Sequence, residues 1–424
     1  MKKVVTISLT TALILLLSAS VLAASTDGFA NFTDSGSYTA GQFRDVNAND
    51  WFAPYVEGAY NYGFFQGKSI DTFEPGGLLT LGEAVTLAAR LMSIYQTGSA
   101  VFPESTPFYS VYADYALSNG IIDGHGDYSA EVTRSRFAEL MFRALPAEAF
   151  PEVNAISDYA ICDVTPDASY GSAVYTLYRA GVLSGSDRFG TFFPDSDITR
   201  AEACAVMVRL ANPALRQRVA LPSAIPAELI FTRSTDAVFL IETFDEFDDS
   251  IRTGSGFFIS DSGYAVTNLH IFENAARAEI TLSCGDVYPI RGAYAVSEEN
   301  NLVIIAIDSD AGGWSYLNLA DSDLIEVGNT VYALGSPLAL INTITEGVVS
   351  SKSRELDGQV FIQFSAPISF GSAGSPVLNS LGQVIGVASS SFSYGQNLNL
   401  AVPVNFIKEL TPGNRILISN LNRG

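Results

Sequence analysis

The first half of the chain carries apolar residues at helical spacing in a series of paired segments. One predicted helix has its apolar face at Val56, Ala59 and Tyr60, and Gly63 lies where that helix should stop. A later predicted helix has its apolar positions at Ala203, Val206, Met207 and Leu210. The pattern therefore predicts helix pairs separated by glycine-rich turns.

The paired segments repeat one pattern three times between about residues 43 and 210. The first copy opens with Phe43-Arg44-Asp45-Val46 and closes with Thr80-Leu81-Gly82-Glu83, and the third runs from Cys162-Asp163-Val164 to Thr199-Arg200-Ala201-Glu202. The middle copy is shorter and closes with Thr133-Arg134-Ser135-Arg136. A period of about 50 to 60 residues indicates one supersecondary unit used repeatedly. Each full copy should be a helix, a turn, an extended Phe-x-Pro segment and a second helix that begins at a Thr-x-x-Glu capping box.

Beyond residue 226 the pattern changes to short apolar runs between turn residues. Residues 213–226 contain Pro213, Pro222 and Pro226 and are expected to form a linker. The predicted strands that follow include residues 238–241, 256–259, 265–267, 303–307, 331–334 and 384–388, and helical periodicity is weak until residues 404–410. Many short strands predict a sandwich or closed barrel, and about 200 residues are enough for two small barrels.

The first 24 residues have the features of a secretory signal peptide. Lys2 and Lys3 precede an apolar run, and small residues at Ala23 and Ala24 mark the expected cleavage site. The uninterrupted apolar run is too short to span a bilayer, so export with cleavage is favoured over a membrane anchor. No transmembrane segment is expected after removal of the signal, which predicts a secreted protein.

The amino-acid composition excludes several kinds of binding site and limits the candidate catalytic residues. Lys and Arg total 23 against 45 Asp and Glu, a net charge of −22, which argues against nucleic-acid binding. With two His and three Cys, a zinc site of four cysteines or three histidines is excluded, and we expect no metal and no cofactor. Imidazole chemistry must use His125 or His270. Cys162 and Cys204 form one disulfide or, as favoured, remain buried thiols, and Cys284 is expected in a strand.

The three copies resemble the S-layer homology (SLH) domain. The resemblance is carried by the Asp-Val start, the glycine-rich middle, the Phe-x-Pro element and the box from Thr199 to Glu202. It implies a mainly α-helical, pseudo-threefold bundle that binds secondary cell-wall polymer, and hence attachment to the bacterial cell wall or S-layer. The implied boundaries are an N-terminal segment (25–42) and three repeats (43–97, 98–150 and 151–212).

Two arginines are the candidate polymer-binding residues. Arg200 and Arg134 occupy the same box position in copies three and two, whereas copy one has Leu81 there. A guanidinium can grip a carboxylate in bidentate fashion. The alternative is that both are surface arginines at helix starts. A cation is unfavourable beside a helix N-terminus, and this cost favours the ligand role. His125, in the turn of copy two, is expected to be an exposed loop residue.

Two stretches after the linker carry a second resemblance. The first joins Gly254-Ser255-Gly256-Phe257 to Thr267-Asn268-Leu269-His270, and the second joins Gly371-Ser372-Ala373-Gly374-Ser375-Pro376 to Gly382-Gln383-Val384-Ile385-Gly386. Each stretch alone is compatible with ordinary strands and turns. Together they resemble a trypsin-like serine protease of the HtrA/Deg type. The resemblance implies an all-β double-barrel domain over residues 227–424.

Matching the residues to the family motif places His270 at the general base. Asn301 occupies the position of the catalytic acid and Ala373 that of the nucleophile, so two of the three triad positions are substituted. Gly371 and the backbone N–H of Ala373 match the oxyanion hole. A methyl group has no hydroxyl proton for an imidazole to remove, so we expect no ordinary serine-protease activity.

Three functions remain open from the sequence. The favoured one is a wall-anchored, inactive protease homologue that binds peptides or proteins. The first alternative is an active cell-surface endopeptidase that uses a displaced serine, Ser372 or Ser375. Because a shift of about 1 Å at a reacting atom costs about 10²-fold, the sequence disfavours this rescue. The second alternative is a structural envelope protein.

Overall fold

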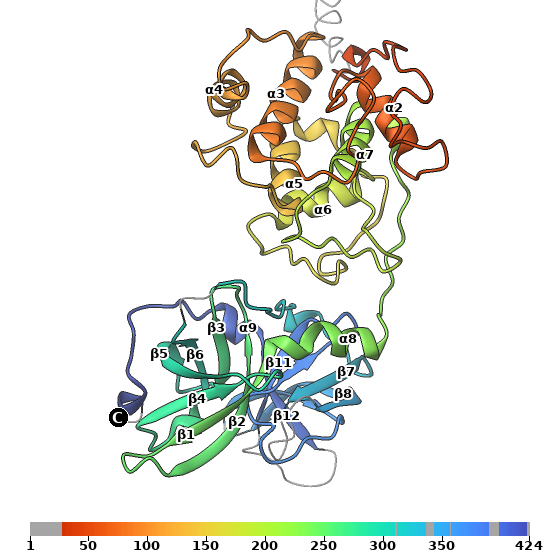
Figure 1. Ribbon diagram of the computed structural model, residues 1–424. Coiled ribbons are helices and arrows are strands. Elements are labelled where there is room, and N and C mark those ends of the chain that lie inside the picture. The colour runs from red at the N-terminus through yellow and green to blue at the C-terminus, as the bar shows by residue number, and fades with distance from the viewer. Residues whose placement is uncertain (1–27, 310–311, 336–342, 357, 390–397, 422–424) are drawn as a thin grey trace, which may run out of the picture. The chain divides into compact units, whose positions relative to one another are not determined.

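The computed structural model describes residues 28–309, 312–335, 343–356, 358–389 and 398–421 (Figure 1). The predicted signal peptide, residues 1–24, lies outside the described residues. The chain divides into two compact units. The first holds residues up to 155 together with 172–184 and 193–220, and the second holds 156–171, 185–192 and the residues from 221 onward. In the described ranges, no helix is long and apolar enough to cross a membrane.

Three pairs of helices make up the repeat region. They are α2 (Ala53–Asn61) with α3 (Leu81–Thr97), α4 (Ser110–Ser118) with α5 (Arg134–Arg143), and α6 (Gly171–Arg179) with α7 (Arg200–Ala211) (Figure 1). Short 3-10 helices are η1 (Gly28–Asn31), η2 (Ala147–Ala149) and η3 (Pro213–Leu215). Gly63, Gly120 and Gly181 follow the first helix of each pair with φ of 73°, 72° and 72°, a left-handed conformation that glycine adopts at little cost. The predicted helix–turn–helix pattern is confirmed.

A ring of three backbone hydrogen bonds joins the copies. The N–H of Leu79 donates to the carbonyl of Ile198 at 3.1 Å, Ile198 donates to Val132 at 3.1 Å, and Val132 donates to Leu79 at 2.9 Å. Each residue lies just before the second helix of its copy, and all three are buried. Because each copy donates to one neighbour and accepts from the other, the ring closes. The predicted pseudo-threefold bundle is therefore confirmed.

The second helices begin in equivalent ways. The amides of Leu81, Arg134 and Arg200 each donate to a backbone carbonyl of another copy at 2.8 Å. These three residues therefore hold the same position, as the sequence comparison predicted. Both predicted capping boxes are present, at Thr80 and Thr199. In the middle copy, Thr133 accepts from the N–H of Arg136 without a reciprocal carboxylate.

The second unit contains two closed, six-stranded antiparallel barrels (Figure 1). The first has the order β1-β2-β3-β6-β5-β4, with β1 (Val238–Phe244), β2 (Ser250–Phe258), β3 (Tyr264–Asn268), β4 (Arg277–Thr281), β5 (Val287–Ser297) and β6 (Leu302–Ile307). The second has the order β10-β11-β12-β9-β8-β7, with β7 (Thr330–Gly335), β8 (Thr343–Leu356), β9 (Gln359–Phe364), β10 (Pro376–Leu378), β11 (Val384–Ser389) and β12 (Asn399–Pro403). The predicted all-β double barrel is confirmed.

Helices in this unit are short. They are α8 (Ala227–Ser234) and α9 (Asn405–Lys408), with 3-10 turns η4 (Thr235–Ala237), η5 (Leu269–Phe272), η6 (Ser322–Leu324) and η9 (Ile418–Asn420). The sequence analysis missed α8. Its eight residues give only about two turns of periodicity. Ile230, which is fully buried in the apolar core, is the side chain that holds the helix in place.

Strand β6, which follows Asn301, is buried along its whole length. Every residue of β6 is buried, and β6 pairs with β3 on one side and β5 on the other. Its unbroken apolar sequence fits a strand covered on both faces. Phe239, Ile241 and Ile305 fill the interior of the first barrel, which gives the turn before β6 a rigid base.

Segments from the third predicted repeat and the predicted linker pack on the second barrel. Gln383 is fully buried, and its Nε2 donates to the carbonyls of Tyr159 at 3.2 Å and Ile161 at 3.1 Å. The N–H of Ile225 donates to the carbonyl of Ser380 at 2.9 Å. These bonds explain why residues 156–171 and 221–226 group with the barrels rather than with the helices.

Candidate functional site

His270 and Asn301 are brought together by the pairing of β3 with β6. His270 lies in η5, directly after β3, and Asn301 lies directly before β6. Because the two strands are antiparallel, with Asn268 opposite Leu302, the end of one meets the start of the other. Asn301 has a φ of 52°, a left-handed conformation that asparagine tolerates better than most residues.

Two hydrogen bonds fix the Asn301 side chain against His270. The backbone N–H of His270 donates to Oδ1 of Asn301 at 2.9 Å, and Nδ2 of Asn301 lies 2.8 Å from Nδ1 of the imidazole. The Asn301 carbonyl also accepts from the N–H of Leu269 at 3.0 Å and from Nδ2 of Asn268 at 3.2 Å. The amide therefore cannot turn over without losing a bond.

This geometry decides the imidazole tautomer. A backbone N–H only donates, so the atom facing it is the amide oxygen, and the amide nitrogen faces the ring. That nitrogen also only donates, so Nδ1 of His270 accepts and the ring proton sits on Nε2. Burial lowers the pKa of His270, which favours the neutral ring. A neutral imidazole with its proton on Nε2 is a hydrogen-bond donor at the position where a peptidase needs a base.

Ala373 lies beside the same part of the first barrel. Its side chain is buried in the apolar cluster that contains Ile271, the residue after His270. The N–H of Ser255, on β2, donates to the Ala373 carbonyl at 2.7 Å. The structure therefore brings the three predicted triad positions, His270, Asn301 and Ala373, to one region of the second unit.

The turn before Ala373 presents two amides. The N–H of Ser372 donates to the carbonyl of Ser369 at 2.9 Å, and Gly371 has a φ of 89°, as at the third position of a type II turn. The hydroxyl of Ser255 donates to the Gly371 carbonyl at 2.8 Å and fixes the turn. Within the described part of the chain, the N–H groups of Gly371 and Ala373 have no hydrogen-bond acceptor. They match the donor pair predicted for the oxyanion hole.

Neither neighbouring serine is hydrogen-bonded to the imidazole. Ser375 is 1% exposed, and a methyl group on Gly335 would overlap its hydroxyl. Ser372 is also buried, and its hydroxyl accepts from the N–H of Ser369 at 3.3 Å. Across the ranges that the structure describes, Nε2 of His270 has no hydrogen-bond partner. The described residues of the site thus present hydrogen-bond donors, and no serine hydroxyl is hydrogen-bonded to the imidazole.

Comparison with known families matches both parts of the chain. The model of the trypsin-like peptidase domain matches residues 254–387, and the model of the S-layer homology domain matches residues 42–85 and 163–204. The chain contains S-layer homology domains and a trypsin-like peptidase domain. The two SLH matches coincide with copies one and three.

Curated relatives of the peptidase domain are HtrA-type proteases. A probable periplasmic serine endoprotease DegP-like of Chlamydia trachomatis is 37% identical over 143 residues, which cover 33% of this chain and 28% of the relative. The putative serine protease HhoA of Synechocystis is 30% identical over 206 residues, covering 44% of this chain and 52% of the relative. The chain therefore spans about a quarter to about half of the length of these relatives.

In the SLH region, the Arg200 side chain is buried and bonds to backbone carbonyls of another copy. Its side chain is 5% exposed, Nε donates to the carbonyl of Phe73 at 3.0 Å, and Nη2 donates to the carbonyl of Gln66 at 2.8 Å. The guanidinium also lies over the rings of Phe65 and Phe73. Burial lowers its pKa, but the ordinary value is so high that the group stays charged. Arg200 thus holds copy three to copy one.

Arg134 joins the middle copy to the third. Its Nη1 lies 2.5 Å from Oε1 of Glu202, and its side chain is 10% exposed. His125 is an exposed loop residue, as predicted, and its Nδ1 lies 2.8 Å from the Tyr128 hydroxyl. The burial of Arg200 and the pairing of Arg134 with Glu202 were not visible in the sequence, which favoured a ligand role for both over surface arginines at helix starts.

All three cysteines are free in this structure. Cys162 and Cys204 are buried, and burial raises the pKa of both thiols. Of the two states left open by the sequence, the structure has the free thiols. The expectation that Cys284 lies in a strand was wrong: it is exposed in the turn between β4 and β5.

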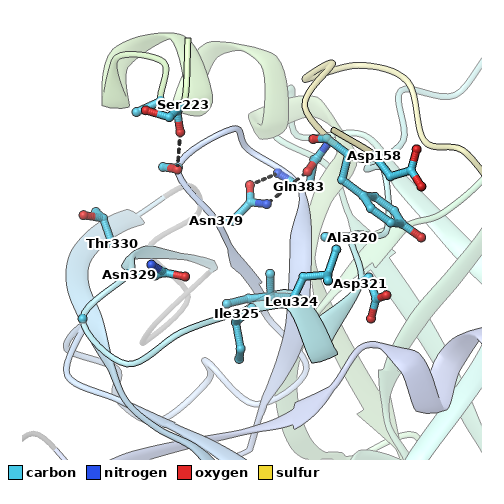
Figure 2. A pocket seen from close by; sticks show the side chains of 15 residues that line it. Asp158, Ser223, Ala320, Asp321, Leu324, Ile325, Asn329, Thr330, Asn379 and Gln383 are labelled. Atoms are coloured by element: carbon cyan, nitrogen blue, oxygen red, sulfur yellow. Dashed lines mark hydrogen bonds between the residues drawn. The ribbon is translucent and has the colours of Figure 1, made fainter. Parts of the chain in front are cut away.

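Sequence reasoning missed a pocket on the second barrel (Figure 2). It has a volume of about 520 Å³ and is lined by residues including Asp158, Ser223, Asp321, Asn379 and Gln383. The hydrogen bond from Asn379 to Gln383, at 3.0 Å, ties its wall together. Over the described ranges, no group of three or more His, Cys, Asp or Glu is placed to hold a metal ion.

The sequence analysis also did not single out Ser255. Its N–H holds the Ala373 carbonyl and its hydroxyl holds the Gly371 carbonyl. The signal was present in the Gly-Ser-Gly-Phe motif. However, a motif alone does not say that a serine on β2 supports a turn more than 100 positions later.

Proposed function

We propose that this chain is a wall-anchored surface protein with a catalytically inactive trypsin-like domain that binds peptides without cleaving them. One observation carries the inactivity: Nδ2 of Asn301 lies 2.8 Å from Nδ1 of His270, while a methyl group occupies the nucleophile position at Ala373. SLH domains are cell-surface anchoring modules, and the peptidase domain is of the HtrA type. Binding to secondary cell-wall polymer is part of the proposal.

Both substitutions block the same chemical step. Acyl transfer begins when an imidazole takes the proton of a hydroxyl that attacks the substrate carbonyl. Ala373 has no hydroxyl, and Asn301 holds the ring proton on Nε2, which leaves no base. In serine proteases the acid-to-amide change alone lowers turnover by about 10⁴. Ser372 and Ser375 are buried and neither hydroxyl is hydrogen-bonded to His270, which argues against the displaced-serine alternative.

The rest of the domain keeps the parts that hold a peptide. The Gly371 turn is supported by Ser255, and both barrels are closed. A rigid, preorganised donor pair binds a carbonyl oxygen whether or not a nucleophile is present. This supports a peptide-binding role over a space-filling one.

The reverse substitution tests the proposal. Ala373→Ser combined with Asn301→Asp should let the full chain react with a fluorophosphonate probe and digest an unfolded protein, because both the nucleophile and the Nε2 base are restored. Ala373→Ser alone should turn over substrate about 10⁴-fold more slowly than the double variant. Adding His270→Ala to the double variant is the matched control and should abolish the gained activity.

In the same assays, the unmodified chain should neither be labelled by the probe nor cleave the unfolded protein. Cleavage by that chain which disappears on His270→Ala would overturn the proposed inactivity. Failure of a well-folded double variant to gain activity would overturn the assignment of Ala373 and Asn301 to the triad positions.

Wall attachment is proposed to depend on the contacts between copies. The net charge of −22 repels an acidic polymer, so attachment depends on local groups. Arg200 and Arg134 remain the proposed residues. Because Arg200 is buried against Phe73 and Arg134 is paired with Glu202, we infer that they act by holding the copies in the arrangement that binds the polymer.

A further inference from the structure

The site formed by His270, Gly371 and Ala373 offers hydrogen-bond donors, and this property favours one kind of ligand. Nε2 of His270 carries a proton, because Nδ1 accepts from Asn301. The amides of Gly371 and Ala373 are donors without acceptors among the described residues. A site with three N–H groups is complementary to a group that only accepts hydrogen bonds.

The substitution at Ala373 also removes an atom. A serine there would place a hydroxyl oxygen between the imidazole and the oxyanion amides, as the catalytic arrangement requires. Alanine has no atom at the position where the serine hydroxyl oxygen would lie. A ligand oxygen in the same position would accept from Nε2 of His270.

We propose that this site binds the C-terminal carboxylate of a peptide. One carboxylate oxygen accepts from the amides of Gly371 and Ala373, and the other takes the position of the missing hydroxyl and accepts from Nε2 of His270. The proposal rests on the inactive, peptide-binding function and names its ligand. Charge-assisted hydrogen bonds of this kind are stronger than neutral ones.

An internal peptide bond fits the same site less well. Its carbonyl supplies one acceptor for the amide pair, but its nitrogen carries a hydrogen. That N–H lies on the side of the imidazole, where Nε2 also carries a hydrogen. Two donors that face each other leave both without an acceptor, which is unfavourable in a partly buried site. A free C-terminus is therefore preferred to the middle of a chain.

The surroundings are compatible with a peptide anion. Glu273, which lies close enough to affect His270, is paired with Arg252 at 2.6 Å, so its charge is compensated. Phe370, next to Gly371 in the turn, is 85% exposed and offers an apolar surface beside the donors. A peptide with a hydrophobic residue near its C-terminus would cover it, whereas acetate would not.

The test measures binding of matched peptides to the full chain. The probes are fluorescein-labelled hexapeptides, a run of alanines that ends in each of the twenty amino acids in turn, made as free acids and as C-terminal amides. Fluorescence polarisation should show that the best free acid binds at least about tenfold more tightly than its amide. Asn301→Asp should remove this preference, because it moves the ring proton to Nδ1 and adds a negative charge.

Asn300→Asp is the matched control. It adds the same charge one residue away, where the Asn300 side chain bonds to Ser297 rather than to the imidazole. The free-acid preference should survive this change. Ala373→Ser, a small change that keeps the fold, should weaken the free acids at least about fivefold, because the hydroxyl occupies the second oxygen position.

Three outcomes would overturn the carboxylate site. They are equal binding of acids and amides, loss of the preference in both Asn variants alike, and the absence of binding by every peptide. Displacement of the peptide by sodium acetate at the peptide's own concentration would overturn the peptide part. Mass spectrometry of the bound peptides separates this proposal from the proposed function: cleavage contradicts the inactivity, whereas equal binding of intact acids and amides contradicts only the carboxylate preference.

Discussion

At the scale of single residues, one amide changes the chemistry of a whole site. Asn301 has nearly the shape of an aspartate, and its side-chain oxygen accepts the backbone N–H of His270. Its nitrogen, however, reverses the direction of the second hydrogen bond. Consequently, Nδ1 of His270 accepts and Nε2 carries the proton, and in the proposed function the ring binds a ligand instead of acting as a base.

The buried imidazole predicts a pH dependence of stability. Burial lowers the pKa of folded His270 below its usual value of about 6.5, so the unfolded chain takes up a proton more readily as the pH falls through and below about 6.5. The stability that neutral His270 provides is complete above this pH and is lost below it. His270→Gln should therefore show a smaller drop in melting temperature of the barrel unit between pH 7.5 and 5.5.

The exposed histidine supplies the control for this measurement. His125→Gln removes a histidine from a solvent-exposed loop of the SLH region and should leave the pH profile of the barrel unit unchanged. If the melting temperature drops equally in His270→Gln and in the unmodified chain between pH 7.5 and 5.5, burial of neutral His270 does not contribute to the acid sensitivity.

At the scale of elements, capping organises the second helix of each copy. Thr199 accepts from the N–H of Glu202, and the Glu202 carboxylate accepts from the N–H of Thr199 at 2.9 Å. The same carboxylate pairs with Arg134 of the middle copy. A local helix signal thus also carries a contact between copies.

Removing this cap should destabilise the helical unit. Thr199→Ala should lower the free energy of unfolding by about 1 kcal/mol or more, because it leaves a helix amide without its acceptor. Thr133→Ala is the matched comparison and should cost less, because the Thr199 hydroxyl also donates to the Glu202 carboxylate at 2.7 Å, whereas the helix that Thr133 caps has no such carboxylate. Urea unfolding followed by circular dichroism measures both. Equal losses would show that the bond from the Thr199 hydroxyl to Glu202 adds nothing.

At the scale of the whole molecule, the residues proposed for wall attachment and those proposed for peptide binding lie in separate compact units. The helical unit is organised around the ring of Leu79, Val132 and Ile198, and the site lies in the barrel unit. This separation means that wall attachment and peptide binding can be tested by different substitutions in the same full-length chain.

Wall attachment should depend on the arginines between copies. Arg200→Ala should weaken sedimentation of the purified protein with isolated cell walls by about tenfold, equivalent to about 1.4 kcal/mol, because the copy-one segment that holds Phe73 loses its tie to α7. The double change with Arg134→Ala should weaken it further. Arg44→Ala removes an exposed cation from the same region and is the charge control. Undiminished sedimentation of the double variant would contradict the assignment.

Much of the local structure follows from short stretches of the sequence. The Thr-x-x-Glu boxes, the glycines after the first helices and the apolar strand runs each reflect preferences of neighbouring residues, and the structure has the elements they predict. The residues proposed for the triad positions could also be named from the sequence, because His270, Asn301 and Ala373 lie in or beside recognisable motifs. The short helix α8 was missed because its position depends on burial of Ile230 rather than on a long pattern.

Tertiary structure alone decided how those residues act. Asn301 lies 31 positions from His270, and Arg200 lies 127 positions from Phe73, so no local pattern encodes either contact. The orientation of one amide set the imidazole tautomer, and burial converted Arg200 from an apparent surface cation into an internal tie. Hydrogen-bond direction and burial are properties of atoms that meet in space, which is why the sequence identified the parts of this protein and the fold decided their chemistry.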